Sequence, residues 1–231
     1  MSDMLLACLF GVLLGMRHAV EPDHLAAVTT LNLRASSPWR GALLGAYWGL
    51  GHALALLALG GALVLMQTQL PARHAALLEG GVGLMLMGLG IASLRRAMCD
   101  GKSGPVQRHS HSGQPHEHAT LGAHLHVGPW TLLKQPLLIG FAHGLAGSGA
   151  LTAVAFSSLP TVGARLFYIA MFGAGATLGM AALSGVLGVP LSQTARRPRL
   201  HRGLSLCAGG FSLLLGVYWT AAAWGLFEAR L

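Results

Sequence analysis

Long apolar stretches with almost no charged side chains make up most of the chain, and polar positions are concentrated in short segments between them. Five of these stretches contain at most one ionisable side chain each. A helix that crosses a bilayer core needs about 20 consecutive apolar residues, so each stretch predicts one membrane-spanning helix. The five stretches are residues 41–66, 75–94, 135–159, 166–191 and 203–227.

A sixth span is expected at residues 4–27, although its polarity changes abruptly after Met16. The next eight residues, Arg17-His18-Ala19-Val20-Glu21-Pro22-Asp23-His24, contain five ionisable groups. Each charged group at the centre of a membrane helix costs about 2.5–3.5 kcal/mol, so we interpret the run as a functional polar cluster. The alternative is a span that ends near Met16 and is followed by a solvated loop. It is disfavoured because residues 4–16 are short for a span and residues 25–28 are apolar again.

The second half of the sequence resembles the first. Residues 15–19 align with residues 140–144 at an offset of 125, and residues 49–54 align with residues 173–178 at an offset of 124. Chance similarity between membrane helices rich in small residues is the alternative. Three spans in each half would give the halves opposite orientations, as in many secondary transporters. We therefore expect an all-α membrane protein with six transmembrane helices in two inverted repeats, residues 1–97 and 130–231, joined by a loop at residues 98–129.

The charge distribution indicates a membrane topology. Only 10% of the residues are charged, and the net charge is +8. The loops after the first, third and fifth spans hold eleven Lys and Arg residues, against three on the opposite side, and basic loops face the cytoplasm. The sequence therefore predicts a multi-pass protein of the cell (cytoplasmic) membrane, with the lipid bilayer as partner and no nucleic acid. Both termini are expected to be non-cytoplasmic and the 98–129 loop cytoplasmic.

His18, Asp23 and His24 have the side chains that bind a borderline divalent metal such as nickel, cobalt or zinc. At 100° per residue, His18 lies about 140° from Asp23 and about 120° from His24 on a regular helix. The three side chains therefore converge only if the helix is distorted between them. Pro22 supplies the distortion, because it has no N–H and its ring clashes with the His18 carbonyl. A broken helix at membrane depth is tolerated where it lines a polar cavity.

Other polar side chains are expected to complete this site. Arg17 can pair with Glu21 at i,i+4, which would lower the net charge of the empty site. His52 and His143 fall in the middle third of their spans, and we interpret them as site residues rather than as hydrogen-bonded structural histidines. The repeat then predicts that the three ligands and His52 line one buried polar pocket, with His143 at its border.

The run from Arg17 to His24 resembles the His-x4-Asp-His signature of the nickel/cobalt transporter family. Leu50-Gly51-His52 is similar to that family's second histidine motif. The segment Gly-Phe-Ala-His-Gly-Leu-Ala-Gly-Ser at residues 140–148 and the six-span length resemble its shorter branch, the urease accessory protein H-like nickel permeases. Longer members have eight spans and further acidic motifs that are not found here.

This resemblance implies a membrane permease whose transported substrate is Ni2+ or, next, Co2+. It implies that His18, Asp23 and His24 are required and that His52 contributes. No catalytic activity and no catalytic cofactor are expected. Pro22 and Ser148, with Arg17 and Glu21, would support the ligands without binding the metal.

Half of the twelve histidines lie in the loop between the two halves, among Ser, Gly and Pro residues. This composition is typical of a disordered metal-binding tract, and a plain polar linker is the alternative. On the cytoplasmic side such a tract could capture or buffer the ion. The six residues are His109, His111, His116, His118, His124 and His126.

Two other functions are compatible with the sequence. One is a membrane-bound nickel chaperone that hands the metal to urease or hydrogenase maturation proteins without conducting it. The other is an intramembrane serine hydrolase, with Ser148 as nucleophile and His143 or His52 as base. The hydrolase leaves both residues 17–24 and the histidine loop unexplained.

Overall fold

The computed structural model describes residues 2–33, 35, 37–99, 107–111, 114–118, 129–194 and 197–225. Helices make up almost all of these residues, which confirms the all-α prediction apart from one short hairpin. The helices are α1 (Ser2–His18), α2 (Pro22–Asn32), α3 (Pro38–Ala55), the π-helix η1 (Leu56–Gly60), α4 (Gly61–Leu65), α5 (Ala72–Cys99), α6 (Pro129–Ser158), α7 (Val162–Thr194) and α8 (Pro198–Ala223). The strands are β1 (Gln107–His111) and β2 (Gln114–His118).

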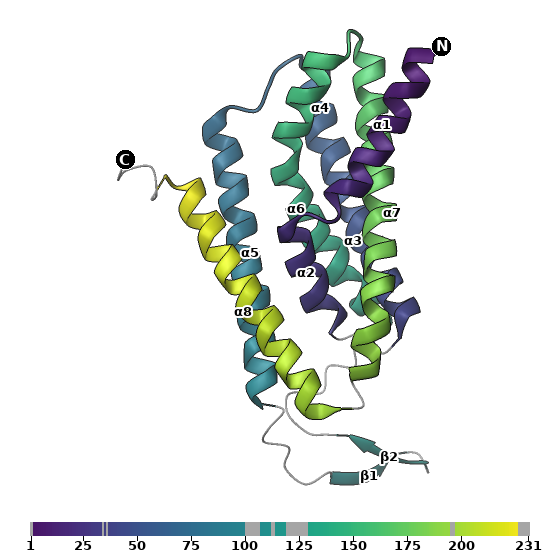
Figure 1. The fold of residues 1–231 in the computed structure, drawn as a ribbon, viewed down its shortest axis with the longest axis vertical. Coiled ribbons are helices and arrows are strands. Elements are labelled where there is room, and N and C mark those ends of the chain that lie inside the picture. The colour runs from purple at the N-terminus through teal and green to yellow at the C-terminus, as the bar shows by residue number, and fades with distance from the viewer. Residues whose placement is uncertain are drawn as a thin grey trace.

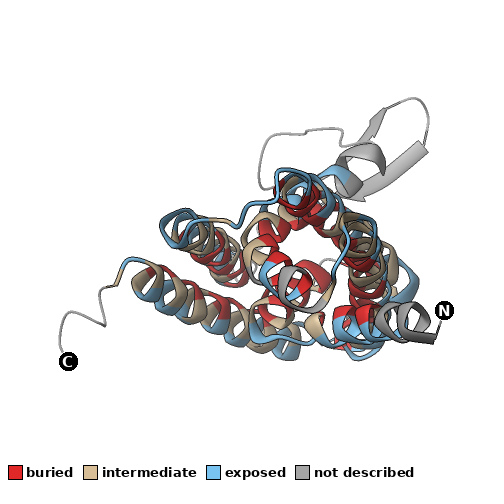
Figure 2. Ribbon diagram, turned by 90° about the horizontal axis from the view of Figure 1, so that it is seen from above, coloured by how far each residue is buried: buried red, intermediate tan, exposed pale blue. Residues whose placement is uncertain are grey.

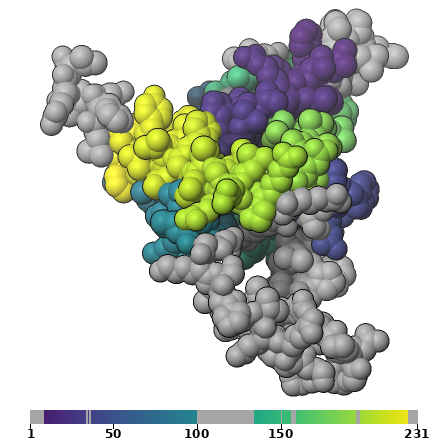
Figure 3. Space-filling model, turned by 60° about the horizontal axis from the view of Figure 1, so that its bottom comes forward, coloured from purple at the N-terminus to yellow at the C-terminus, as the bar shows by residue number. Residues whose placement is uncertain are grey.

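The helices run roughly parallel or antiparallel to one another in one bundle (Figure 1). We call the end that carries the α4–α5 and α6–α7 connections the upper end. The other end, where α5 and α7 finish and α3, α6 and α8 begin, is the lower end. Figure 3, in which the lower end comes forward, shows segments of the N-terminal helices beside α7 and α8 on one face.

Four helical segments of the described chain are long and apolar enough to cross a membrane. Large apolar side chains point outward from the bundle, and Leu138, Val186 and Leu214 are 66%, 68% and 72% exposed. Exposed apolar surface on this scale is expected where lipid covers the protein. The chain is therefore a multi-pass membrane protein, as predicted. The four segments are Pro38–Leu65, Ala72–Cys99, Val162–Thr194 and Pro198–Ala223.

The two remaining expected spans are not among these four segments. The expected span at residues 4–27 is divided, because α1 ends at His18 and α2 begins at Pro22. The expected span at residues 135–159 lies, except for its last residue, on α6, a helix of 30 residues that ends at Ser158.

Close backbone approach holds the centre of the bundle together. α3 packs against α7 on one side and against α6 on the other, and α1 also packs on α7. A Cβ atom at Gly45 would collide with the Met180 carbonyl oxygen, and one at Gly144 with the His52 carbonyl oxygen. Small residues permit this approach, which matters in a bilayer because lipid provides no hydrophobic drive for helix association. The buried faces of these helices point inward (Figure 2).

α5 and α8 form a second tightly packed pair at one side of the bundle (Figures 1 and 2). The Ser212 hydroxyl of α8 donates to the Leu86 carbonyl oxygen at 2.9 Å. The Ser93 hydroxyl of α5 donates to the Ser205 carbonyl oxygen at 3.1 Å. These bonds satisfy hydroxyl groups that lipid could not solvate.

The backbone of β1 pairs with that of β2 in an antiparallel hairpin within the expected 98–129 loop. This part of the loop, expected to be disordered, therefore has regular backbone pairing, which satisfies the N–H and C=O groups that face the partner strand. The hairpin includes four of the loop histidines, but their side chains lie outside the described residues, and so do His124 and His126 entirely. Metal binding by the loop stays a prediction.

Candidate metal centre

The helix break predicted from Pro22 lies between α1 and α2. α1 ends at His18, and Glu21 is extended, with φ −65° and ψ 151°. The residue before a proline is disfavoured in the helical conformation, and a proline at the first position of a helix loses no hydrogen bond. The break lets the side chain of His18 come beside that of His24.

Two carboxylates next to the break bond to imidazole rings: Glu21 to one ring and Asp23 to two. The Glu21 Oε2 accepts a hydrogen bond from the His18 Nδ1 at 2.9 Å. Asp23 bridges two rings, because its Oδ1 accepts from the His24 Nδ1 at 3.0 Å and its Oδ2 from the His143 Nε2 at 2.9 Å. A carboxylate can only accept, so the nitrogen that faces it carries the proton and the lone pair of the neutral ring is on the other nitrogen. The Nε2 atoms of His18 and His24 and the Nδ1 of His143 are therefore the atoms available to a metal.

Four imidazole rings, from α1, α2, α3 and α6, gather at this point. The His24 ring centroid is 4.3 Å from that of His18 and 5.3 Å from that of His52. It is also 4.2 Å from that of His143, so the rings of His18 and His143 lie within about one helix diameter, 10 Å, of each other. His18, His24 and His52 each offer a nitrogen within 4.8 Å of the others, and Asp23, His24 and His143 form a second group of the same size.

Three of the four rings are deeply buried, whereas the His18 side chain is 17% exposed, and several of the buried nitrogens have no partner. His24 and His52 are 0% exposed and His143 is 3% exposed. Within the described ranges, the His24 Nε2, both nitrogens of His52 and the His143 Nδ1 make no hydrogen bond. A buried polar atom left without a partner costs about 1–3 kcal/mol. A cation bound by these nitrogens would remove that cost.

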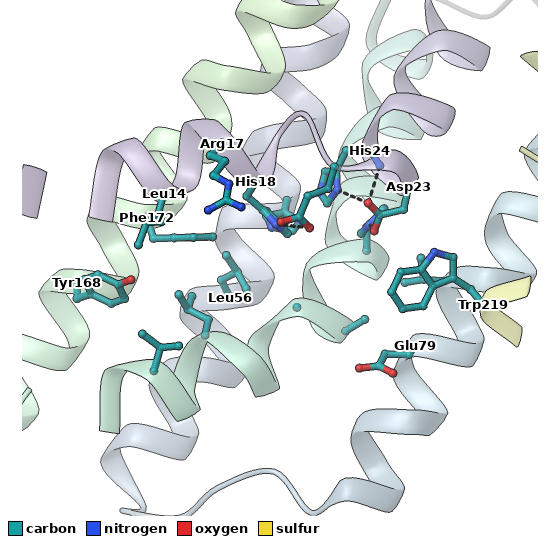
Figure 4. A pocket seen from close by; sticks show the side chains of 18 residues that line it. Leu14, Arg17, His18, Asp23, His24, Leu56, Glu79, Tyr168, Phe172 and Trp219 are labelled. Atoms are coloured by element: carbon teal, nitrogen blue, oxygen red, sulfur yellow. Dashed lines mark hydrogen bonds and ion pairs between the residues drawn. The ribbon is translucent and has the colours of Figure 1, made fainter. Parts of the chain in front are cut away.

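A pocket of about 430 Å³ adjoins the cluster. Figure 4 shows His18, Asp23 and His24 at one part of its wall and Glu79, from α5, at another. The remaining lining side chains are mostly apolar and come from the level of the cluster or from nearer the upper end, such as Leu56 of η1. The pocket therefore approaches the cluster through the upper half of the bundle.

Packed side chains separate the cluster from the lower end. Trp48, Leu86 and Met180 are each 0% exposed and belong to one apolar core cluster. The Asn32 side-chain amide donates to the Ser184 carbonyl oxygen at 2.9 Å, which ties the end of α2 to α7. Packed side chains therefore fill the lower side of the cluster, whereas the pocket adjoins it toward the upper end.

The side chains that were predicted to share one pocket do lie together, although the rest of the lining is mostly apolar. His18, Asp23, His24 and His52 line it, and His143 lines it with them. The prediction that these residues bind metal is not tested by this arrangement.

Two expectations about neighbouring residues are not met. The prediction of an Arg17–Glu21 ion pair is wrong. Both residues line the pocket, but Glu21 contacts His18 instead. The helix break explains the difference. Residues 17 and 21 do not lie on one continuous helix, so their side chains are not brought together as an i,i+4 pair. Ser148 is fully buried but is not among the lining residues, and its hydroxyl donates to the Leu145 carbonyl oxygen at 2.7 Å. The described contacts of Ser148 include no histidine, so the serine–histidine arrangement expected for a hydrolase is not formed.

Sequence reasoning missed the contributions of α5 and α8 to the pocket. Glu79 and Trp219 line it together with the predicted residues. Glu79 had a signal in the sequence, since it is the only ionisable side chain in the 75–94 stretch. Trp219 had no such signal in the sequence, because a tryptophan in an apolar helix commonly serves only to pack against its neighbours.

The donor set suits a transition metal. Imidazole nitrogens favour Ni2+, Co2+ or Zn2+, and a carboxylate hydrogen-bonded to a metal-binding imidazole fixes its orientation and raises its basicity. The C-terminal end of α1, which carries His18, has a partial negative charge that favours a cation there. Fold and site together define a multi-pass membrane protein with a buried histidine–aspartate group of metal-binding type.

Comparison with known proteins identifies the family. The chain is 33% identical over 218 residues to the urease accessory protein UreH of Bacillus sp. (strain TB-90), an alignment that covers 94% of this chain and 91% of that protein. The chain belongs to the UreH family of urease accessory proteins. No protein-family model matches the chain. No solved structure matches it either.

Proposed function

We propose that this protein is a permease that carries a divalent transition-metal cation across the cell membrane, with Ni2+ the first candidate and Co2+ the second. The observation that carries the proposal is the group of buried imidazole nitrogens without partners beside a pocket. His52 lies near the middle of the Pro38–Leu65 segment, and His143 lies near the middle of α6. A binding site at this depth is what a transporter needs, because it can be reached from either side in turn.

The proposal includes six spans in two inverted repeats, with α1 and α2 as a broken first span and α6 as the fourth. Equivalent close contacts support it. A Cβ atom at Gly175 would collide with the Val12 carbonyl oxygen, and one at Gly51 with the Leu137 carbonyl oxygen. The two contacts are related by the sequence offsets of the repeat, 124 from Gly51 to Gly175 and 125 from Val12 to Leu137. The pairing of α1 with α7 likewise corresponds to that of α6 with α3.

The proposed topology places the lower end in the cytoplasm. The basic loops that begin or end α3, α5 and α8 are at that end, and basic loops face the cytoplasm. The pocket then faces the outside. The histidine loop between α5 and α6 would be cytoplasmic, where it could hold an ion that leaves the buried site.

A nickel chaperone is the second candidate, because the relative is named as a urease accessory protein. Such a chaperone would bind metal and pass it to urease or hydrogenase maturation proteins without moving it through the bilayer. The two functions differ in one measurable property. A permease transfers the ion into a closed compartment in the absence of any other protein, and a chaperone does not.

The deciding experiment uses purified protein in sealed liposomes that contain a nickel-sensitive dye. Uptake of added Ni2+ is expected with the natural chain. It is expected to fall by about tenfold or more in His52→Asn, which removes a buried imidazole that could bind the metal. His74→Asn is the matched control, since His74 is exposed at the start of α5 and does not line the pocket. Binding of Ni2+ by a protein that gives no uptake would refute the permease and favour the chaperone.

A further inference from the structure

Glu79 is a carboxylate in the pocket that the proposed metal site does not use. It lies on α5, seven residues after Ala72 and therefore about 10 Å below the upper end of that helix. Figure 4 shows Glu79 set apart from His18, Asp23 and His24 along the pocket. Its side chain points from α5 into the pocket (Figure 4).

Packing does not explain a carboxylate at this position. Glu79 is half-buried and has no hydrogen-bond or ion-pair partner among the described residues. An acidic side chain within a membrane span is costly and normally marks an ion pathway. The neighbouring contacts of α5 with α8 are made without it, since Gly80 packs against Trp224 and Gly83 against Thr220.

The position of Glu79 matches the direction from which the pocket approaches the histidines. Packed side chains around Trp48 separate the cluster from the lower end, whereas Glu79 and the pocket lie toward the upper end. The fully buried ring of His52, with both nitrogens unpartnered, lines the same pocket. A divalent cation that enters from the upper side therefore meets the Glu79 carboxylate before it reaches the imidazoles.

We propose that Glu79 is an outer capture site, which attracts and transiently binds the divalent cation on its way to the histidine cluster. This inference rests on the proposed transport function. A single half-buried carboxylate binds a divalent cation weakly. Weak binding lets the ion move on to the imidazole nitrogens, which bind it more strongly. Focused negative charge in a low-dielectric pocket raises the local cation concentration and the rate of entry by about 10- to 1,000-fold.

The test is Glu79→Gln, which keeps the size of the side chain and removes its charge. In the liposome assay, the Ni2+ concentration for half-maximal uptake is expected to rise by about tenfold or more, with little change in the maximal rate. Capture by charge is screened by salt, so half-saturation of the natural protein should rise with ionic strength and that of Glu79→Gln should not. The Co2+ absorption spectrum of the histidine cluster should be the same in both proteins, because Glu79 is not one of its ligands.

Glu79→Asp is the companion variant, which keeps the charge and is expected to transport with near-natural half-saturation. If Glu79→Gln does not fold, Glu79→Asp and the salt dependence of the natural protein still decide the question. Equal half-saturation in Glu79→Gln and the natural chain would overturn the capture role and leave the transport function standing. A changed Co2+ spectrum in Glu79→Gln would also overturn it, because the carboxylate would then act at the cluster itself. Absence of uptake by the natural chain would overturn the transport function, and the capture role with it.

Discussion

Replacing Asp23 with asparagine is expected to weaken metal binding by removing the bridge between two imidazole rings. In the natural chain both carboxylate oxygens accept hydrogen bonds, from His24 at 3.0 Å and from His143 at 2.9 Å. An asparagine has one accepting oxygen and one donating nitrogen, so it can satisfy only one of the two N–H groups. The other ring must move or change tautomer. For His24 the change would put a proton on the Nε2 that faces the cluster.

The size of the effect follows from burial and from the number of bonds. Loss of a carboxylate that orients a metal ligand typically costs 10- to 100-fold in affinity, which corresponds to about 1.4–2.8 kcal/mol. The Asp23 side chain is 16% exposed and makes two such bonds, so we expect the upper part of that range. Glu21→Gln is the matched comparison. The Glu21 side chain is 52% exposed and makes one bond to His18, and exposed pairs contribute about 0–1 kcal/mol, so its loss should be no more than about fivefold.

The assay is a titration with Co2+, followed through its visible absorption and then by competition with Ni2+, on protein in lipid nanodiscs. Both variants are made in a chain that lacks residues 103–127, so that the loop histidines do not contribute to the signal. Thermal unfolding of each variant shows whether the fold survives. Equal affinity in Asp23→Asn and its parent, or a larger loss in Glu21→Gln than in Asp23→Asn, would refute the assignment of Asp23 as the bridge.

Three further changes test other parts of the structure. Pro22→Ala allows Glu21 to become helical, which would close the break that lets His18 come beside His24. Metal affinity should therefore fall while thermal stability is kept or raised. Unchanged affinity would mean that the ligands converge for another reason. Deletion of residues 103–127 should lower the nickel bound per protein in equilibrium dialysis yet keep uptake at saturating metal, because the proposed transport site lies among the helices and not in the loop. Loss of all uptake in a chain that still reaches the membrane would contradict this. Gly175→Ala forces a Cβ against the Val12 carbonyl oxygen and should destabilise the protein by about 1–3 kcal/mol, whereas Gly81→Ala, with open space around its Cβ, should not lower the melting temperature.

Much of the fold could be predicted because membrane helices satisfy their backbone hydrogen bonds internally. The apolar stretches at residues 41–66, 75–94, 166–191 and 203–227 each overlap most of a helical segment able to cross a membrane. The helix break is equally local, since the effect of Pro22 depends on the residues just before it. The fold class, the approximate bounds of four spans and the position of the polar cluster were therefore determined by the sequence alone.

The partners of the polar side chains were decided by the tertiary structure. Asp23 bonds to His143, which lies 120 residues away, and no local rule specifies that contact. Glu21 contacts His18 rather than Arg17 because the turn after α1 changes which side chains face each other. Glu79 joins the pocket only because α5 packs against α6 and α2. Local residue type determines helices and breaks, but the atoms available to a metal depend on how separate helices pack, which short-range patterns in the sequence do not record.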